Sequence, residues 1–193
     1  MKKISLVLMS VLFAALNLTT SSASAATTGD LVISGEVTAI LAMEIYDAAD
    51  SAPITTYTAL TLADGGMSET QIATLHEKCN DSEGYTVNLS AASGVAGGTT
   101  LSYLTGATNT GTKIAYTLKY QDVAVVFASG LEELTSTTAI NVGFPSFTTK
   151  TLKITIVDNN TGGNTGALGA NDLAILPSDT YSDTLTFTIA SKA

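Results

Sequence analysis

The chain has 193 residues, a formal net charge of −9, and eight Lys but no Arg. This acidic balance argues against nucleic acids and anionic lipid surfaces as partners, because both attract basic proteins. The single Cys, at position 79, excludes an intramolecular disulfide, so stability must come from the hydrophobic core and the backbone hydrogen bonds.

Residues 1–25 are typical of a secretory signal peptide. Lys2 and Lys3 precede a mostly apolar stretch over 4–18, and the small residues Ala23-Ser24-Ala25 form a cleavage site. The apolar stretch is short for a membrane span, although an uncleaved N-terminal anchor is the alternative. Cleavage leaves 168 residues with a net charge of −11, which suits one exported domain with no later membrane span.

In residues 31–41 one parity is apolar apart from Gly35, and Glu36 and Thr38 lie on the other, which is typical of an extended strand with one apolar face. The residues of the apolar parity are Leu31, Ile33, Gly35, Val37, Ala39 and Leu41. A second apolar segment, 43–46, follows without a turn, so roughly sixteen residues are predicted to be extended, more than an average strand contains. Two interpretations remain open: one long strand, or a leading arm that pairs elsewhere, followed by the first strand of the domain.

Short segments with the same alternation recur along the rest of the chain. They lie at 85–89, 114–120, 152–156 and 181–189. In the last segment, which is predicted to be one strand, Tyr181, Leu185, Phe187 and Ile189 share one face. Residues 68–78 are the one helix candidate, but they fit a helix poorly and favour a strand or mixed structure. The pattern predicts an all-β protein, a sandwich or barrel of antiparallel strands.

Clusters of Gly, Asn, Asp and Ser predict the turns between these strands. Residues 80–84 form one such turn, and Asp122 lies in a tight link that makes a hairpin of 114–120 and 123–127. Residues 158–172 form a long polar loop before the final strand.

No catalytic, cofactor-binding or metal site is predicted. His76 and Cys79 are the only residues of their kinds, and on a strand a spacing of three places them on opposite faces. The chain lacks a visible set of nucleophile, base and orienting group, and this pair lacks the further ligands of a metal centre. Residues 158–162 resemble a calcium-binding loop only loosely, and a solvated turn is the preferred interpretation.

Three segments resemble pilins of the chaperone–usher pathway, in particular the alpha-type fimbriae and the archaic, spore-coat-U-like subunits. Residues 31–41, followed by 45–50, look like the donor strand and first strand of the alpha type. Residues 79–90 look like the Cys…Gly-Tyr…Leu segment of the spore-coat-U group. Residues 176–189 look like the final strand of both groups and are the most specific of the three segments.

Two departures leave the subfamily open. Spore-coat-U subunits usually pair the Cys that matches Cys79 with one in the first strand, where this chain has Ala42-Met43. Ser178-Asp179 replace the more usual small Gly near the start of the final strand.

In this family each subunit is an immunoglobulin-like sandwich that lacks its last strand, and the arm of a neighbour completes it by donor-strand exchange. The resemblance implies a signal peptide over 1–25, a donor-strand arm over 26–40 and a pilin domain over 41–193. The implied donor face consists of Leu31, Ile33, Gly35, Val37 and Ala39, and the implied acceptor groove is lined by Tyr181, Leu185, Phe187 and Ile189.

The resulting hypothesis is a structural subunit of a surface fimbria that polymerises head to tail and supports adhesion or biofilm formation. Its implied partners are other copies of the chain, a periplasmic chaperone and an outer-membrane usher, and the resemblance also allows a tip adhesin. The alternative hypothesis is a monomeric secreted β-sandwich that binds a ligand such as a carbohydrate. The first predicts a subunit that is unstable or polymerises without its chaperone, and the second predicts a folded monomer.

Overall fold

The computed structural model divides the chain into two compact units, Met1–Glu36 and Val37–Ala193. Only residues 33–36 of the first unit are described, so the predicted signal peptide, 1–25, and Leu31 lie outside the described residues. Every assigned strand belongs to the second unit. The described residues are 33–58, 60, 62, 64–93, 101–127, 131–138, 142–143, 146–160, 163–167 and 171–192.

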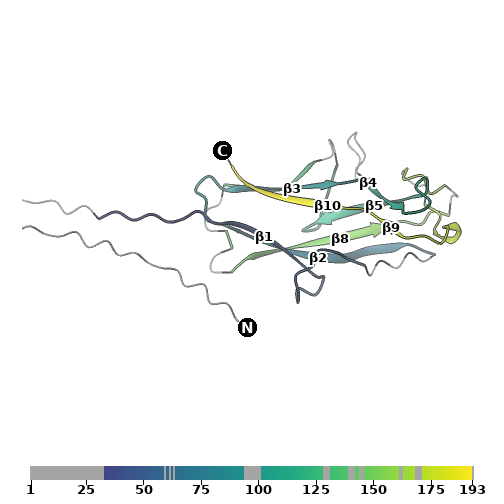
Figure 1. Ribbon diagram of the computed structural model, residues 1–193, viewed down its shortest axis with the longest axis horizontal. Helices are drawn as coiled ribbons and strands as arrows, with labels where there is room; N and C mark the ends of the chain where they lie inside the picture. The colour runs from purple at the N-terminus through teal and green to yellow at the C-terminus, as the bar shows by residue number, and fades with distance from the viewer. Residues whose placement is uncertain are drawn as a thin grey trace, which may run out of the picture. The chain divides into compact units, whose positions relative to one another are not determined.

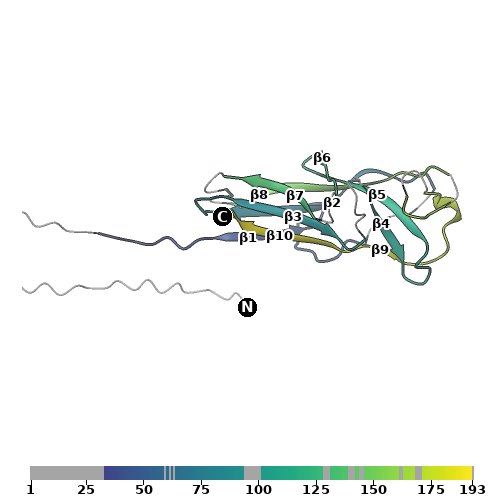
Figure 2. The same cartoon turned by 90° about the horizontal axis from the view of Figure 1, so that it is seen from above.

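The second unit is an antiparallel β-sandwich, so the predicted all-β fold class is confirmed (Figure 1). The larger sheet has the order β1-β2-β8-β5-β4-β9, with β6 paired to β5, and the smaller sheet has the order β10-β3-β7 (Figure 2). The elements are β1 (Leu41–Tyr46), β2 (Met67–Cys79), β3 (Tyr85–Ala91), β4 (Leu101–Gly106), β5 (Lys113–Tyr120), β6 (Val123–Ala124), β7 (Glu132–Thr137), β8 (Thr148–Ile156), the 3₁₀ helix η1 (Leu173–Ile175), β9 (Tyr181–Ser182) and β10 (Leu185–Ser191).

Helical structure within the described residues is limited to the short η1. The segment 68–78, for which the sequence favours a strand, lies in β2. Across the part of the chain that the structure describes, no helix has the length and apolar character required to cross a bilayer.

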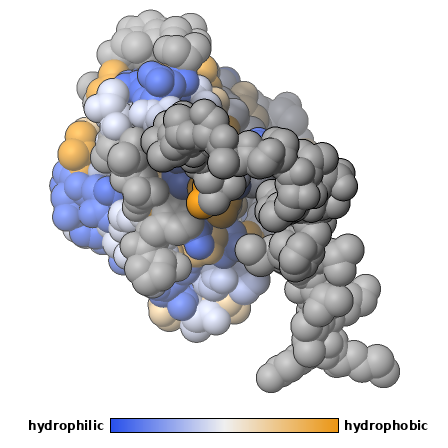
Figure 3. All heavy atoms as spheres, turned by 90° about the vertical axis from the view of Figure 1, so that its left-hand side faces the viewer, coloured by the Kyte–Doolittle hydropathy of each residue, from blue (hydrophilic) through white to orange (hydrophobic). Residues whose placement is uncertain are grey.

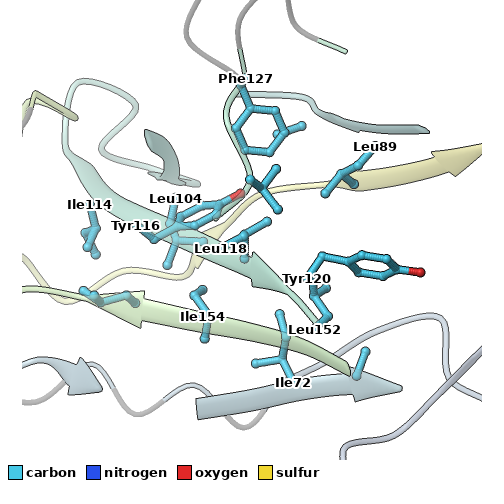
Figure 4. Packing of buried hydrophobic residues seen from close by; sticks show 14 of the residues in the cluster. Ile72, Leu89, Leu104, Ile114, Tyr116, Leu118, Tyr120, Phe127, Leu152 and Ile154 are labelled. Carbon is cyan, nitrogen blue, oxygen red and sulfur yellow. The ribbon is translucent and has the colours of Figure 1, made fainter. Parts of the chain in front are cut away.

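Burial follows the alternation seen in the sequence. In β3, Tyr85, Val87 and Leu89 are at most 1% exposed, whereas the residues between them are half-buried. The strands of the larger sheet supply the opposite side of the core. Figure 4 shows Ile72, Leu118 and Ile154, from β2, β5 and β8, packed in the layer that Leu89 faces.

The predicted hairpin link at Asp122 is confirmed. β5 pairs with β6 across the two residues Gln121 and Asp122, whose φ angles are +48° and +64°. Positive φ at both central residues is typical of the two-residue turn whose twist matches that of the flanking strands. Lys153 of β8 donates to the Asp122 carboxylate at 2.5 Å, which holds the turn against the sheet.

The turn predicted over 80–84 carries the chain from the larger sheet to the smaller one. Gly84 has a φ of +82°, and a Cβ there would lie 1.9 Å from the Thr137 carbonyl oxygen. Glycine is therefore required for β3 to begin beside β7.

The single final strand predicted over 181–189 is wrong, because the structure divides this segment between the two sheets. β9 pairs with β4 in the larger sheet, and β10 pairs with β3 in the smaller sheet. The chain crosses at Asp183 and Thr184. The parity prediction holds within β10, where Leu185, Phe187 and Ile189 are half-buried and the intervening threonines are exposed.

A buried carboxylate joins the two sheets. Glu77 of β2 has no exposed surface and accepts hydrogen bonds from Tyr120 of β5, Tyr85 of β3 (2.7 Å) and Thr135 of β7 (3.2 Å). Burial, followed by the hydrogen bond to Glu77, raises the pKa of both tyrosines, so their hydroxyls remain donors.

We expect Glu77→Leu to lower the free energy of unfolding by about 2–4 kcal/mol, because the two buried tyrosine hydroxyls lose their acceptor. Urea denaturation monitored by circular dichroism measures the change. The same substitution at the exposed turn residue Glu83 is the matched control and should change stability by at most about 0.5 kcal/mol. Equal stability of the two variants would contradict a stabilising role for the Glu77 cluster.

Candidate functional site

Two sheet edges on the same side of the sandwich have no further strand paired to them among the described residues. β1 is the last strand of the larger sheet, β10 is the last strand of the smaller sheet, and the two strands are in contact (Figure 1). A free edge presents unpaired backbone N–H and C=O groups that can accept a further strand.

An apolar groove of about 720 Å³ opens between these edges, and we call it the edge groove. Ile45 of β1 lines one side, and Leu185 and Phe187 of β10 line the other. Its floor is the core itself, formed by Ile72 of β2 and Leu152 and Ile154 of β8 among others. The hydrophobic core is therefore reachable from outside along this side of the domain.

The inward-facing residues of β10 are less buried than the β3 residues with which they pair. Phe187 pairs with Leu89 and Ile189 pairs with Val87 across the β10–β3 ladder. The β3 partners have no exposed surface, whereas Phe187 and Ile189 remain half-buried. Among the described residues, the side of β10 that faces away from β3 is therefore covered only in part, by its contact with β1.

The chain that follows β1 covers one end of the edge groove. Pro53 forms a bridge with Tyr46, and the Ile54 amide donates to the Ile45 carbonyl at 2.9 Å. Further apolar residues of this segment that pack against the core are Tyr57, Leu60 and Leu62. Among the described residues, this pairing reaches only the last two residues of β1, and the free edge from Leu41 to Glu44 remains available.

Asp183 holds the crossing between the two sheets at the polar end of the edge groove. Its carboxylate accepts hydrogen bonds from Tyr116 (2.5 Å), Ser93 (2.7 Å) and Ser102 (3.1 Å). Burial, followed by the charge of Asp183, raises the pKa of Tyr116, which keeps this hydroxyl protonated as a donor. These bonds explain why the chain leaves β4 here and joins β3, which places β10 at a sheet edge.

The predicted acceptor residues are largely brought together. Tyr181, Leu185 and Phe187 line the edge groove. Ile189 instead packs against a second core cluster that contains Cys79, Tyr85 and Val87.

The predicted donor residues that the structure describes are exposed. Ile33 and Val37 are each 85% exposed, Gly35 and Ala39 are exposed too, and no strand is assigned over 33–40. Of the two interpretations of 31–46, separate segments fit better, since β1 begins at Leu41. On the face seen in Figure 3, the coloured surface is mostly hydrophilic, with small hydrophobic patches.

Several lining residues were not predicted to form a groove. Ile45, Ile72, Leu104, Leu152 and Ile154 have the alternation of ordinary core residues, and their role follows only from their position beside the open edges. Ile54, Leu60 and Leu62 lie outside regular strands, where no periodicity could identify them.

His76 and Cys79 lie on opposite faces of β2, as predicted. Cys79 is fully buried, whereas His76 stacks on Tyr46 with ring centroids 4.2 Å apart and contacts the Asp50 carboxylate at 2.6 Å. In the described ranges, no group of three or more His, Cys, Asp or Glu residues is arranged to hold a metal ion.

Asp179 lies at the groove rim and anchors the β4–β5 turn. Its carboxylate accepts backbone hydrogen bonds from Asn109 (2.7 Å), Thr180 (2.8 Å) and Thr108 (3.0 Å). These bonds, that of Asn109 foremost, lower the pKa of Asp179 in the folded protein. The ionised carboxylate therefore stabilises the fold above the unfolded-state pKa, which is about 3.9, and this contribution is lost as the pH falls through the folded-state pKa.

We expect Asp179→Asn to lower the thermal unfolding midpoint at pH 7. The difference from wild type should shrink below about pH 4, because the wild-type carboxylate becomes protonated and loses its advantage. Thermal unfolding followed by circular dichroism at about pH 7 and about pH 3 measures both values. A difference that is equally large under the acidic condition would exclude the ionised carboxylate as its cause.

Comparison with known proteins identifies no family for this chain, since neither a family model nor a curated protein sequence matches it.

Proposed function

We propose that this chain is a structural subunit of a surface fimbria: an immunoglobulin-like sandwich that lacks one strand and is completed by the N-terminal arm of a second copy. The observation that carries the proposal is the edge groove itself. Two neighbouring edge strands, β1 and β10, flank an opening into the hydrophobic core, and one extended strand could pair with β10 and with the part of β1 that Pro53 and Ile54 leave unpaired.

The arm has the pattern that such a groove requires. Ile33 and Val37 are exposed and share one parity with Leu31 and Gly35, so one face of an extended arm would enter the core while the other faces solvent. Burial of Leu31, Ile33 and Val37 at about 1.5–3 kcal/mol each would contribute about 5–9 kcal/mol before the cost of ordering the arm. Ladder hydrogen bonds to the two edges would add to this gain.

Insertion of one arm into the groove of another copy would also produce a polymer. An arm that inserts into the groove of another copy leaves its own domain's groove open for the next arm. This contact is heterologous and does not close on itself, so it produces a linear fibre. We further propose that the predicted signal peptide directs export, that a periplasmic chaperone occupies the groove before assembly, and that an outer-membrane usher exchanges it for the arm. The exposed free edges favour this sequence of events, because an uncapped groove would promote aggregation.

One test compares two adjacent arm residues of opposite parity. In the full chain produced with its chaperone and usher, Ile33→Asp should reduce surface fibres by about tenfold or more, because it would bury a carboxylate in the apolar groove. Ser34→Asp introduces the same charge on the solvent-facing parity and should leave fibre yield within about twofold of wild type. Electron microscopy and quantification of surface-extracted polymer measure the yield. Equal yields from the two variants would refute insertion of the Ile33 face.

A second test separates this function from that of a self-sufficient ligand-binding monomer. A variant lacking residues 26–37 should be unstable alone, and a peptide of residues 26–40 at about a hundredfold excess over its Kd should raise the unfolding midpoint by about 5–10 °C. The same peptide with Ile33→Asp is the control and should have little effect. A stable armless monomer that does not respond to the peptide would favour the ligand-binding alternative.

A further inference from the structure

The root of the arm is bound to its own domain by Asn80. The Asn80 amide donates to the Ile40 carbonyl at 3.1 Å, its side-chain oxygen accepts from the Ile40 amide at 2.5 Å, and its side-chain nitrogen donates to the Thr38 carbonyl at 3.1 Å. We call these three hydrogen bonds the Asn80 clamp.

The clamp extends the β1–β2 ladder beyond its last regular pair, Leu41 with Cys79. In a continued antiparallel ladder, residues 40 and 80 would exchange two backbone hydrogen bonds. In this chain the backbone turns away after Asn80, and the Asn80 side-chain oxygen takes the place of its own carbonyl. The turn that carries Asn80 is itself braced, since the Gly84 amide donates to the Asp81 carbonyl at 3.2 Å and the Glu83 amide donates to the Asp81 carboxylate at 3.0 Å.

The clamp restricts which arm residues can leave the domain. Ala39 lies between the two clamped backbone groups, the Thr38 carbonyl and the Ile40 amide. It cannot enter the groove of another copy unless the clamp opens. Val37 precedes the clamp and is 85% exposed, so it is the last apolar residue of the arm that is free to be donated.

We propose that Asn80 positions the arm so that the donated strand ends at Val37, and that Ala39 remains with its own domain. This inference rests on the proposed function, and it removes Ala39 from the donor face that the sequence implied. It also leaves the connection between neighbouring subunits without slack, because the inserted segment and the clamped segment follow one another directly. The partner at this joint is the groove of a second copy of the chain.

The register is tested by the same substitution at two positions of one parity. With chaperone and usher present, Val37→Asp should reduce fibre yield by about tenfold or more, because it buries a carboxylate, whereas Ala39→Asp should reduce it by no more than about twofold. An equal loss from Ala39→Asp would overturn the proposed register. If neither Val37→Asp nor Ile33→Asp reduced fibre yield, the proposed function itself would fail.

The clamp is tested independently of fibre yield. In the subunit purified as its complex with the chaperone, Asn80→Ala should speed hydrogen exchange of the Ile40 amide by about tenfold, because the amide loses its acceptor. Asn80→Asp keeps a side-chain oxygen that can accept from the Ile40 amide, so this amide should remain protected. Thr38→Ala is the control and should leave the exchange unchanged, because the clamp uses only the backbone carbonyl of Thr38. Fibres of Asn80→Ala should show a wider spread of curvature in electron micrographs than wild-type fibres. Unchanged Ile40 exchange and unchanged curvature in Asn80→Ala would refute the clamp while leaving strand donation intact.

Discussion

The hydrophobic core of this sandwich reaches the surface along one side, between the free edges of β1 and β10. Two unsatisfied requirements meet there: backbone groups that need partners and apolar side chains that need cover. Either requirement alone could be met by water or by a loop, but together they call for an extended segment with one apolar face. The remaining features of the domain either create this opening or limit what can fill it.

Buried or half-buried polar groups determine where the opening lies. Asp183 collects hydroxyl donors from Tyr116, Ser93 and Ser102, and the chain changes sheets at that point, so β10 becomes an edge strand. Glu77 holds the two sheets together further along with three hydroxyl donors. Because an unpaired buried polar group is costly, these clusters specify one arrangement of the sheets in a way that apolar contacts alone would not.

The contacts at the two ends of β1 differ in whether they cover its free edge. At the far end, Pro53 and Ile54 return alongside Tyr46 and Ile45, and they cover part of the edge. At the near end, Asn80 holds the root of the arm and leaves the edge from Leu41 onward free. The edge that remains for another strand is thus limited on both sides by residues of the domain itself.

Alternation of apolar residues was sufficient to predict the central strands, because β3, the second half of β8 and β5 apart from Ala115 bury every second side chain, and a period of two is a local property. It was also sufficient to mark the face of β10 that carries Leu185 and Phe187. It failed at Asp183, where the same parity continues from Tyr181 although the chain changes sheets, since side-chain direction does not record which strand is the neighbour. It also could not separate groove residues such as Ile72 and Ile154 from ordinary core, because both kinds face inward.

The sequence by itself determined that this is an acidic, all-β chain with one apolar face per strand and an alternating segment ahead of the first strand. Only the tertiary structure decided that β1 and β10 are neighbouring edges, that the core opens between them, and that the alternating segment is bound at its root by Asn80. The physical reason is that the alternation that marks a strand involves only neighbouring residues. Sheet edges, the groove and the Asn80 clamp instead depend on contacts between segments that are far apart in the chain.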